Sequence, residues 1–403
     1  MRRGSAIAAA GLAAAGILAA SPVNAGTSLE GVPAHRHVGV LVLENESESA
    51  TFGSGSPATY LNSLLTQGAF AGNYYADGHV SLDNYVTMTS GQPGNLASYS
   101  DCMTQNLYQC QLTVNTPVYG SGINIADQVE NTTSPLSNVK ETWKEYADSM
   151  PSPCFHGDLS PTAAPPDPYQ GDGSGDSTYT GDYADRHNPF VYYSDITGTA
   201  SSPNPRCAAH VVPFTTLAAD LSSNSLPDYF FITPDTCHDG HDGPTCANGQ
   251  SGGLVAADTW LENNLPSLLA YLNANDGVLF ITFDEGNPTG DETGCCTGGQ
   301  GGTQGFGGKV GLLALGAGVK TGSSVSQPAT ANAYDHASLL RTTEDALGIS
   351  TYLNNASTAT PMSDLFAQPS TDTPEAPLVL LLPVAAGATV AATALWRRRR
   401  YRR

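Results

Sequence analysis

Four short apolar runs, each ended by polar residues or glycine, have the length and composition of buried β-strands. They are residues 38–43, 229–233, 278–283 and 310–315. The segments between them repeat apolar residues with a helical period. Helices are expected at residues 56–67, 82–90, 254–272 and 337–347. Strands that alternate with helices predict an α/β fold, in which a largely parallel sheet is covered by helices on both faces.

Polar side chains follow three of these strands directly. Glu44 and Asn45 follow the first, Asp284 and Glu285 follow the third, and the second is followed by a segment that contains Asp235, Asp239, His241 and Asp242. Parallel strands end at one edge of a sheet, where ligands bind in open α/β folds. An acid after a strand is often only a helix cap or a turn residue. So many carboxylates at one edge would nevertheless repel one another unless a cation held them, which predicts a metal site.

A second group of polar residues surrounds Ser81, at the start of a predicted helix. The stretch reads His79-Val80-Ser81-Leu82-Asp83-Asn84-Tyr85. A serine at a helix start lies near free backbone N–H groups and the positive end of the helix dipole, where a phosphate would be stabilised. The alternative is an ordinary serine N-cap.

The spacing around Ser81 resembles a known nucleophile helix. Gly91 stands ten residues after Ser81 and Asn84 three residues after it. This pattern is similar to the alkaline phosphatase superfamily and, more narrowly, to the bacterial and fungal phosphoesterase family of acid phosphatases and phospholipases C. Further matching motifs are Val42-Leu43-Glu44-Asn45, His187-Asn188-Pro189-Phe190, Ile232-Thr233-Pro234-Asp235, Asp239-Gly240-His241-Asp242, Phe283-Asp284-Glu285-Gly286 and Asp335-His336-Ala337-Ser338-Leu339. The chain departs from the family at Val80 and Asp83, where prolines are usual, and at Ser49-Ala50-Thr51 before Phe52-Gly53.

This resemblance implies an alkaline phosphatase-like three-layer sandwich with one divalent metal ion. The implied metal ligands are Glu44, Asn45, Asp284, Glu285 and Ser81, with Ser81 also the nucleophile. His79 and His241 are the expected proton donors, and the expected substrate-binding residues are Asn84, His187, His336 and Asp239. A shell of carboxylates and an amide favours Ca²⁺, Mg²⁺ or Mn²⁺, and Zn²⁺ becomes credible if His241 also binds the ion.

The two ends of the chain predict export and anchoring. Residues 1–25 have the pattern of a secretory signal peptide. Residues 26–368 would form the phosphoesterase domain, and residues 369–377 a linker. Residues 378–396 are long and apolar enough to span a membrane, and the arginines at 397–403 would form a cytoplasmic tail. The domain would then face the outside of the cell, unless processing of the tail releases it.

Charge and cysteine content limit the partners and the compartment. Between the two ends, 8 Lys+Arg face 37 Asp+Glu, so binding of nucleic acid through a basic patch is not expected. No protein partner is predicted. The 8 cysteines suit disulfides in an oxidising compartment. Proximity in the sequence nominates the pairs Cys102–Cys110 and Cys237–Cys246, and it leaves the adjacent Cys295 and Cys296 unplaced.

Three functions remain open from the sequence. The first is an exported, membrane-anchored, metal-dependent phosphoesterase of the acid phosphatase type that hydrolyses phosphate esters through a phosphoserine. The second is a phospholipase C that acts on phospholipid headgroups. The third is a surface binding protein that has kept the fold and lost the chemistry, although every residue expected for the reaction is present.

Overall fold

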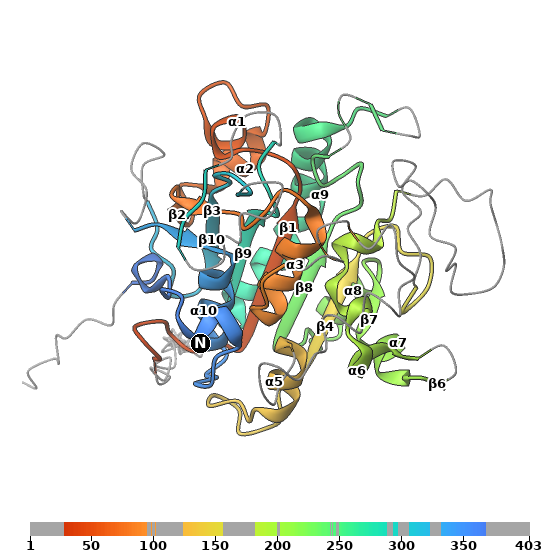
Figure 1. Cartoon of the computed structure of the whole chain (residues 1–403). Helices are drawn as coiled ribbons and strands as arrows, with labels where there is room; N and C mark the ends of the chain where they lie inside the picture. The colour runs from red at the N-terminus through yellow and green to blue at the C-terminus, as the bar shows by residue number, and fades with distance from the viewer. Residues whose placement is uncertain are drawn as a thin grey trace, which may run out of the picture. The chain divides into compact units, whose positions relative to one another are not determined.

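A seven-stranded mixed sheet forms the centre of the computed structural model (Figure 1). The strand order is β2-β10-β9-β1-β8-β4-β7. The strands are β1 (His37–Leu43), β2 (Ala69–Ala71), β4 (Trp143–Ala147), β7 (Val211–Pro213), β8 (Tyr229–Thr233), β9 (Gly277–Phe283) and β10 (Leu312–Gly316). All neighbours from β9 to β7 pair in parallel, whereas β10 is antiparallel to β9 and β2. The predicted α/β fold with a mostly parallel sheet is confirmed.

The structure describes residues 28–94, 98, 101, 124–155, 182–199, 202–241, 243, 245–246, 250–287, 293–296, 306–322 and 332–367. The described residues up to Phe366 belong to one compact unit. The predicted signal peptide, linker, membrane span and basic tail lie outside the described residues. Among the helices that are described, none has the length and apolar character needed to cross a membrane.

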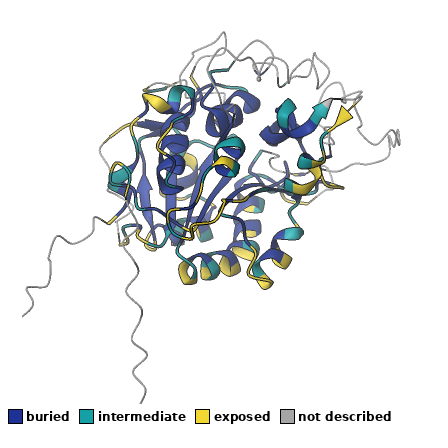
Figure 2. Cartoon of the chain, turned by 90° about the horizontal axis from the view of Figure 1, so that it is seen from below, coloured by how far each residue is buried: buried dark blue, intermediate teal, exposed yellow. Residues whose placement is uncertain are grey.

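Helices cover both faces of the sheet (Figures 1 and 2). Helices α3 (Ser81–Ser90) and α10 (His336–Ala346) pack together on one face, and α9 (Gly253–Ala274) packs against β9 and β10 on the other. Every residue of β1, β8 and β9 is therefore buried. This explains why these strands are continuous apolar runs without alternating polar residues.

Shorter elements complete the fold. The remaining helices are α1 (Glu48–Phe52), α2 (Thr59–Leu64), α5 (Ile125–Asn131), α6 (Ser194–Thr197), α7 (Pro205–His210) and α8 (Thr216–Ser222). The 3-10 helices are η3 (Asp185–His187), η4 (Pro189–Tyr192), η5 (Asn354–Ser357) and η6 (Ser363–Leu365). Two small sheets pair β3 (Tyr74–Tyr75) with β11 (Tyr334–Asp335), and β5 (Gly198–Thr199) with β6 (Ser202–Pro203).

The structure differs from the sequence-based expectation mainly in short elements. Helix α2 begins later than expected, because Ser56 Oγ accepts a hydrogen bond from the backbone N–H of Ala58 (3.1 Å) and holds a turn there. The sequence does not predict strand β4, because Lys144 and Glu145 interrupt its apolar residues. Residues 310–311 precede β10 instead of opening it.

Three disulfides lie in the described part of the chain. The predicted pair Cys237–Cys246 is confirmed. Cys154 pairs with Cys207, and the adjacent Cys295 and Cys296 pair with each other. The predicted pair Cys102–Cys110 lies outside the described residues.

Candidate active site

The carboxyl ends of β8, β1 and β9 bring the predicted polar residues to one edge of the sheet. Strand β1 lies between the other two and pairs in parallel with both. Backbone hydrogen bonds continue beyond the strands. The N–H of Glu44 donates to the carbonyl oxygen of Asp239 (2.9 Å), and the N–H of Asp284 donates to the carbonyl oxygen of Leu43 (2.8 Å). The three segments are thus fixed relative to one another before any side chain contributes.

Glu44 is the centre of a buried hydrogen-bonded group. Ser81 Oγ donates to Glu44 Oε1 at 2.7 Å. His187 Nε2 lies 2.5 Å from Glu44 Oε2, and His187 Nδ1 lies 3.3 Å from Asp239 Oδ2. The ring of Tyr85 stacks on that of His187, with centroids 5.4 Å apart. The predicted nucleophile therefore has its hydroxyl proton directed at a buried carboxylate.

Asn45 connects Glu44 with the end of β9. Its side-chain amide donates to Glu44 Oε1 (3.1 Å), and its backbone N–H donates to Asp284 Oδ1 (3.2 Å). The φ angle of Asn45 is 59°, a left-handed conformation that asparagine tolerates better than most residues. The strained backbone turns the chain sharply after β1 and sets both contacts.

His79 and Glu285 form a second contact of the site. His79 Nδ1 is 3.6 Å from Glu285 Oε2, and both side chains are buried. His241 approaches from the β8 segment, where its backbone N–H donates to Asp239 Oδ1 at 2.8 Å. Of the predicted proton donors, His79 thus lies beside a carboxylate through its ring, and His241 contacts one through its backbone.

The side-chain amide of Asn84, which was predicted to bind substrate, makes hydrogen bonds within the protein. Its Oδ1 accepts from the backbone N–H groups of Asp77 and Gly78 (2.9 and 3.1 Å). Its Nδ2 donates to the carbonyl oxygens of Gly78 and Val80 (2.9 and 3.1 Å). An asparagine amide offers two donors, and both are used here. Asn84 therefore shapes the loop that carries His79 to Ser81.

Both ring nitrogens of His336, which was predicted to bind substrate, contact other groups of the protein. Its Nε2 lies 2.6 Å from the carbonyl oxygen of Asp284, and its Nδ1 lies 2.8 Å from the hydroxyl of Tyr74. Burial lowers the pKa of His336 to about 4, so the ring is neutral. With both nitrogens engaged, His336 is a positioning residue for the Asp284–Glu285 segment.

The start of α3 is capped by a residue that the sequence did not nominate. Asp101 Oδ1 accepts a hydrogen bond from the backbone N–H of Leu82 at 2.9 Å. A carboxylate at this position is stabilised by the helix dipole and satisfies one of the first N–H groups. Ser81 is thus the first residue of the helix and not its side-chain cap.

The sequence assigns no role to two further residues near Glu44. Arg186 is buried, and its positive charge acts on Glu44 and Glu285. Tyr85 fixes the plane of the His187 ring. Arg186 directly precedes the His187 motif, and Tyr85 is the last residue of the stretch around Ser81, so their positions are the signal that could have identified them.

Burial dominates the electrostatics of the site. Burial raises the pKa of Asp239, Asp284 and Glu285 well above the usual range, and the charge of Glu44 adds to each shift. Burial also opposes ionisation of Glu44. The interactions of Glu44 with His187 nevertheless outweigh burial and lower the pKa of Glu44. Burial lowers the pKa of His187 to about 4. Glu44 is therefore the ionised carboxylate of this group, and His187 Nε2 donates a hydrogen bond to its Oε2.

The buried oxygen atoms of the site suit a divalent metal ion. Asn45 Oδ1, Asp284 Oδ2 and Glu285 Oε2 are buried and accept no hydrogen bond from any described residue. Buried acceptors without donors are costly unless a cation is bound. Glu44, His187 and Asp239 form a tighter group, whose ligand atoms all lie within 4.8 Å of one another. The structure thus adds His187 and Asp239, predicted as substrate contacts, to the residues that can hold the ion.

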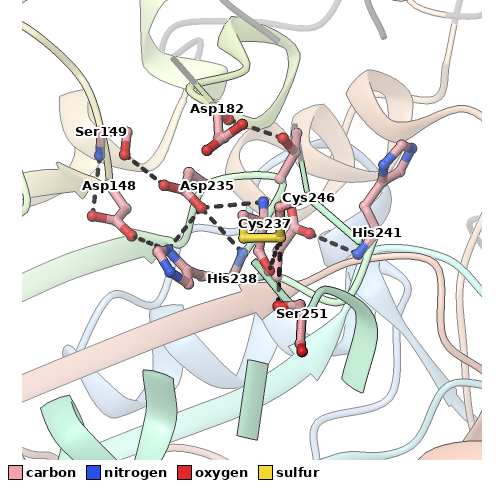
Figure 3. Close-up of a disulfide and its surroundings, with 11 residues drawn as sticks. Asp148, Ser149, Asp182, Asp235, Cys237, His238, His241, Cys246 and Ser251 are labelled. Carbon is pink, nitrogen blue, oxygen red and sulfur yellow. Dashed lines mark hydrogen bonds and ion pairs between the residues drawn. A yellow bond between two sulfur atoms is a disulfide. The ribbon is translucent and has the colours of Figure 1, made fainter. Parts of the chain in front are cut away.

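A second acidic group lies on the other side of the β8 segment (Figure 3). His238 Nδ1 lies 3.0 Å from Asp148 Oδ2 and 2.8 Å from Asp235 Oδ1. Burial alone would lower the pKa of His238. The hydrogen bonds to both carboxylates and their charges outweigh burial and raise it to about 10. His238 is therefore a cation that closes an ion-paired triad.

Comparison with known proteins identifies similar chains. A family model described as "Phosphoesterase family" matches residues 50–350. A phosphatidylinositol-3-phosphatase of Mycobacterium tuberculosis is 26% identical over 68% of this chain and 74% of its own length. A phosphate-repressible acid phosphatase of Penicillium chrysogenum is 26% identical over 66% of this chain, and an acid phosphatase of Aspergillus fumigatus is 27% identical over 68%. The chain spans about half the length of these two fungal relatives (52% and 49%).

Among solved structures, a protein of the alkaline phosphatase superfamily from Vibrio parahaemolyticus matches with a TM-score of 0.46 and 11% identity. The match covers 87% of this chain and 77% of that protein.

The Asn84→Ala substitution should destabilise the fold by about 2–4 kcal/mol, because two buried backbone N–H groups lose their acceptor. Urea unfolding followed by circular dichroism measures the change. The control is Asn131→Ala, which removes one exposed bond from Asn131 Nδ2 to the carbonyl oxygen of Asp127 (2.8 Å). Equal stability of the two variants would contradict the structural role of Asn84.

The ion-paired triad should make stability depend on pH in the alkaline range. The folded pKa of His238, about 10, exceeds its unfolded value of 6.5, so its contribution is complete below about pH 6.5. The contribution falls as pH rises and is lost as pH passes through 10. Comparison of the unfolding free energies of wild type and His238→Gln between pH 6 and 10 should show a shrinking difference. A difference that stays constant would refute the cationic assignment.

Proposed function

The chain belongs to the Phosphoesterase family, and on this premise we propose that it hydrolyses phosphate monoesters with Ser81 as the nucleophile and with the help of a divalent metal ion. The observation that carries the proposal is the hydrogen bond from Ser81 Oγ to the buried Glu44 Oε1. The names of the fungal relatives, both acid phosphatases, support monoesters as the substrate class.

The residues of the site can perform each proton transfer of the reaction. Ser81 Oγ attacks phosphorus, and its proton moves to Glu44 Oε1, which already accepts the hydrogen bond. The bond between phosphorus and the ester oxygen breaks, and the leaving oxygen takes a proton from His79 or His241. A water molecule then attacks the phosphoserine and gives one proton to the histidine that protonated the leaving oxygen. The bond from phosphorus to Oγ breaks, and Ser81 Oγ takes its proton back from Glu44.

We propose that Glu44, Asn45, Asp284 and Glu285 hold the metal ion beside Ser81. When bound, a divalent ion supplies positive charge that lowers the pKa of a serine hydroxyl and stabilises charge on phosphoryl oxygens. Asn45 Oδ1 and Asp284 Oδ2 are buried and accept no hydrogen bond from a described residue, which supports this assignment. His187 contacts Glu44 from the other side, and Asp239 contacts His187. His187 would become a ligand if the ion accepts nitrogen, and Asp239 could then bind through a carboxylate oxygen.

The buried Arg186 fits a role in attracting the substrate dianion. A site of several carboxylates in an acidic chain repels phosphate, and Arg186 is a buried cation whose charge reaches Glu44 and Glu285. Its position beside His187 places it next to the proposed reaction centre.

The Ser81→Ala substitution should lower hydrolysis of p-nitrophenyl phosphate by at least about a thousandfold, because no other group replaces the nucleophile. The matched control is Ser63→Ala, an exposed serine whose Oγ donates to Tyr60. Chelator should abolish the activity of wild type, and added divalent ions should restore it. Retained activity in folded Ser81→Ala would refute the serine mechanism, and activity unaffected by chelator would refute the metal.

The same assay distinguishes the other two functions. Preference for p-nitrophenyl phosphorylcholine over p-nitrophenyl phosphate would indicate a phospholipase C. A folded protein that binds no metal and cleaves neither compound would be the non-catalytic surface protein.

We further propose that the chain is exported and held at the outer face of the cell membrane by residues 378–396. The signal-like residues 1–25 and the arginines that follow residue 396 support this topology. The disulfides Cys154–Cys207 and Cys237–Cys246 support an oxidising compartment.

Protease added to intact expressing cells should degrade the chain, whereas a variant that lacks residues 1–25 should stay protected inside. Immunoblots with and without cell lysis provide the measurement. A full-length chain that is protected in intact cells would contradict export.

A further inference from the structure

The small sheet of β3 and β11 brings Tyr74 beside His336. Tyr74 pairs with Tyr334 in the parallel register of the two strands, and His336 follows β11 as the first residue of α10. The carbonyl oxygen of Tyr74 also accepts the backbone N–H groups of Val310 and Gly311 (2.9 and 3.1 Å). The side chains of Tyr74 and His336 are fully buried, so neither can exchange its hydrogen-bond partner for solvent.

The hydrogen-bond partners of His336 determine which ring nitrogen carries the proton. Nε2 lies 2.6 Å from the carbonyl oxygen of Asp284, which can only accept, so Nε2 is protonated. The hydroxyl of Tyr74 lies 2.8 Å from Nδ1, and among the described residues it has no other hydrogen-bond partner. Since a buried hydroxyl needs an acceptor for its proton, Tyr74 donates to Nδ1. This bond holds the ring in the tautomer that donates to Asp284.

The contact bears on the proposed metal ligands because the carbonyl group of Asp284 lies beyond the end of β9. The N–H of Asp284 still donates to Leu43, but no described backbone N–H donates to its carbonyl oxygen. His336 supplies that bond. Asp284 Oδ1 in turn accepts from the N–H groups of Asn45 and Glu285 (3.2 and 2.6 Å). The orientation of the peptide group after Asp284 therefore affects three proposed ligands.

We propose that Tyr74 is a positioning residue for metal binding, which acts through His336 on the peptide group between Asp284 and Glu285. This inference rests on the proposed function, because the residues that it orients are ligands of the proposed metal site. The hydroxyl of Tyr74 makes no described hydrogen bond to a proposed ligand, so its effect passes through His336. Loss of such a supporting hydrogen bond typically weakens metal binding about 10–100-fold.

The Tyr74→Phe substitution tests the proposal, because it removes the hydroxyl and keeps the ring. Calorimetric titration with Mn²⁺, an ion that suits carboxylate and carbonyl ligands, should give a dissociation constant about 10–100-fold higher in the variant than in wild type. The matched control is Tyr146→Phe, which removes a hydrogen bond from another buried tyrosine to Asp220 Oδ2 (2.7 Å). It should bind Mn²⁺ like wild type.

The His336→Gln substitution tests whether Tyr74 acts through His336. In the His336→Gln background, adding Tyr74→Phe should cause no further loss of Mn²⁺ affinity, because the group that connects Tyr74 with Asp284 is already gone. An equal loss of affinity in both backgrounds would show that Tyr74 acts by another route, and it would overturn the proposal.

Histidine ¹⁵N NMR of the metal-free protein tests the tautomer separately from metal binding, and His336→Gln identifies the signals of His336. Wild type should carry its proton on Nε2, and Tyr74→Phe should shift the Nδ1 resonance. A proton on Nδ1 alone in wild type, or equal Mn²⁺ affinity of wild type and Tyr74→Phe, would overturn the positioning role and leave the proposed function intact. Wild type that binds no Mn²⁺ would overturn the proposed metal site and this inference together.

Discussion

Glu44, Asp239, Asp284 and Glu285 are buried together at one edge of the sheet, and this concentration of acidic groups constrains the rest of the site. Burial disfavours every carboxylate charge, and each ionised neighbour disfavours the next. Without a cation the group can be accommodated only by protonation, as the raised pKa values of Asp239, Asp284 and Glu285 indicate. A bound divalent ion would replace those protons, so metal binding and proton release are coupled.

The fold provides a rigid support for this costly arrangement. Strands β8, β1 and β9 are joined by parallel pairing, and backbone bonds extend to Glu44 and Asp284 beyond the strand ends. A further layer of side chains fixes orientation. His336 holds the carbonyl group of Asp284, Asn84 holds the loop before Ser81, and Tyr85 holds the ring of His187. Such supporting contacts are what allow a reactive geometry to persist.

Asp83 shows how one departure from the family pattern changes this support. It stands where the resembling family usually has proline, is buried on α3, and its Oδ1 accepts no hydrogen bond from a described residue. Burial, and then the charge of Glu285, raise its pKa well above the usual range. A neutral Asp83 therefore adds no further negative charge beside Glu285.

The segment from Asp235 to His241 connects the reaction centre with the ion-paired triad. Asp239 contacts His187 in the reaction centre, whereas His238 pairs with Asp148 and Asp235. The disulfide Cys237–Cys246 holds the segment at its middle (Figure 3). A cross-link over so few residues limits the freedom of both sides at once.

The sequence by itself determined the central strands, the helix that begins at Ser81, and the acids that follow β1, β8 and β9. These features are local, because strand and helix periods and the residue after a strand are encoded in neighbouring positions. The tertiary structure alone decided that His187 meets Glu44, that Asp101 caps α3, and that Asn84 and His336 use their polar atoms within the protein. Those contacts join distant parts of the chain, and the pKa shifts depend on burial, which no local pattern encodes.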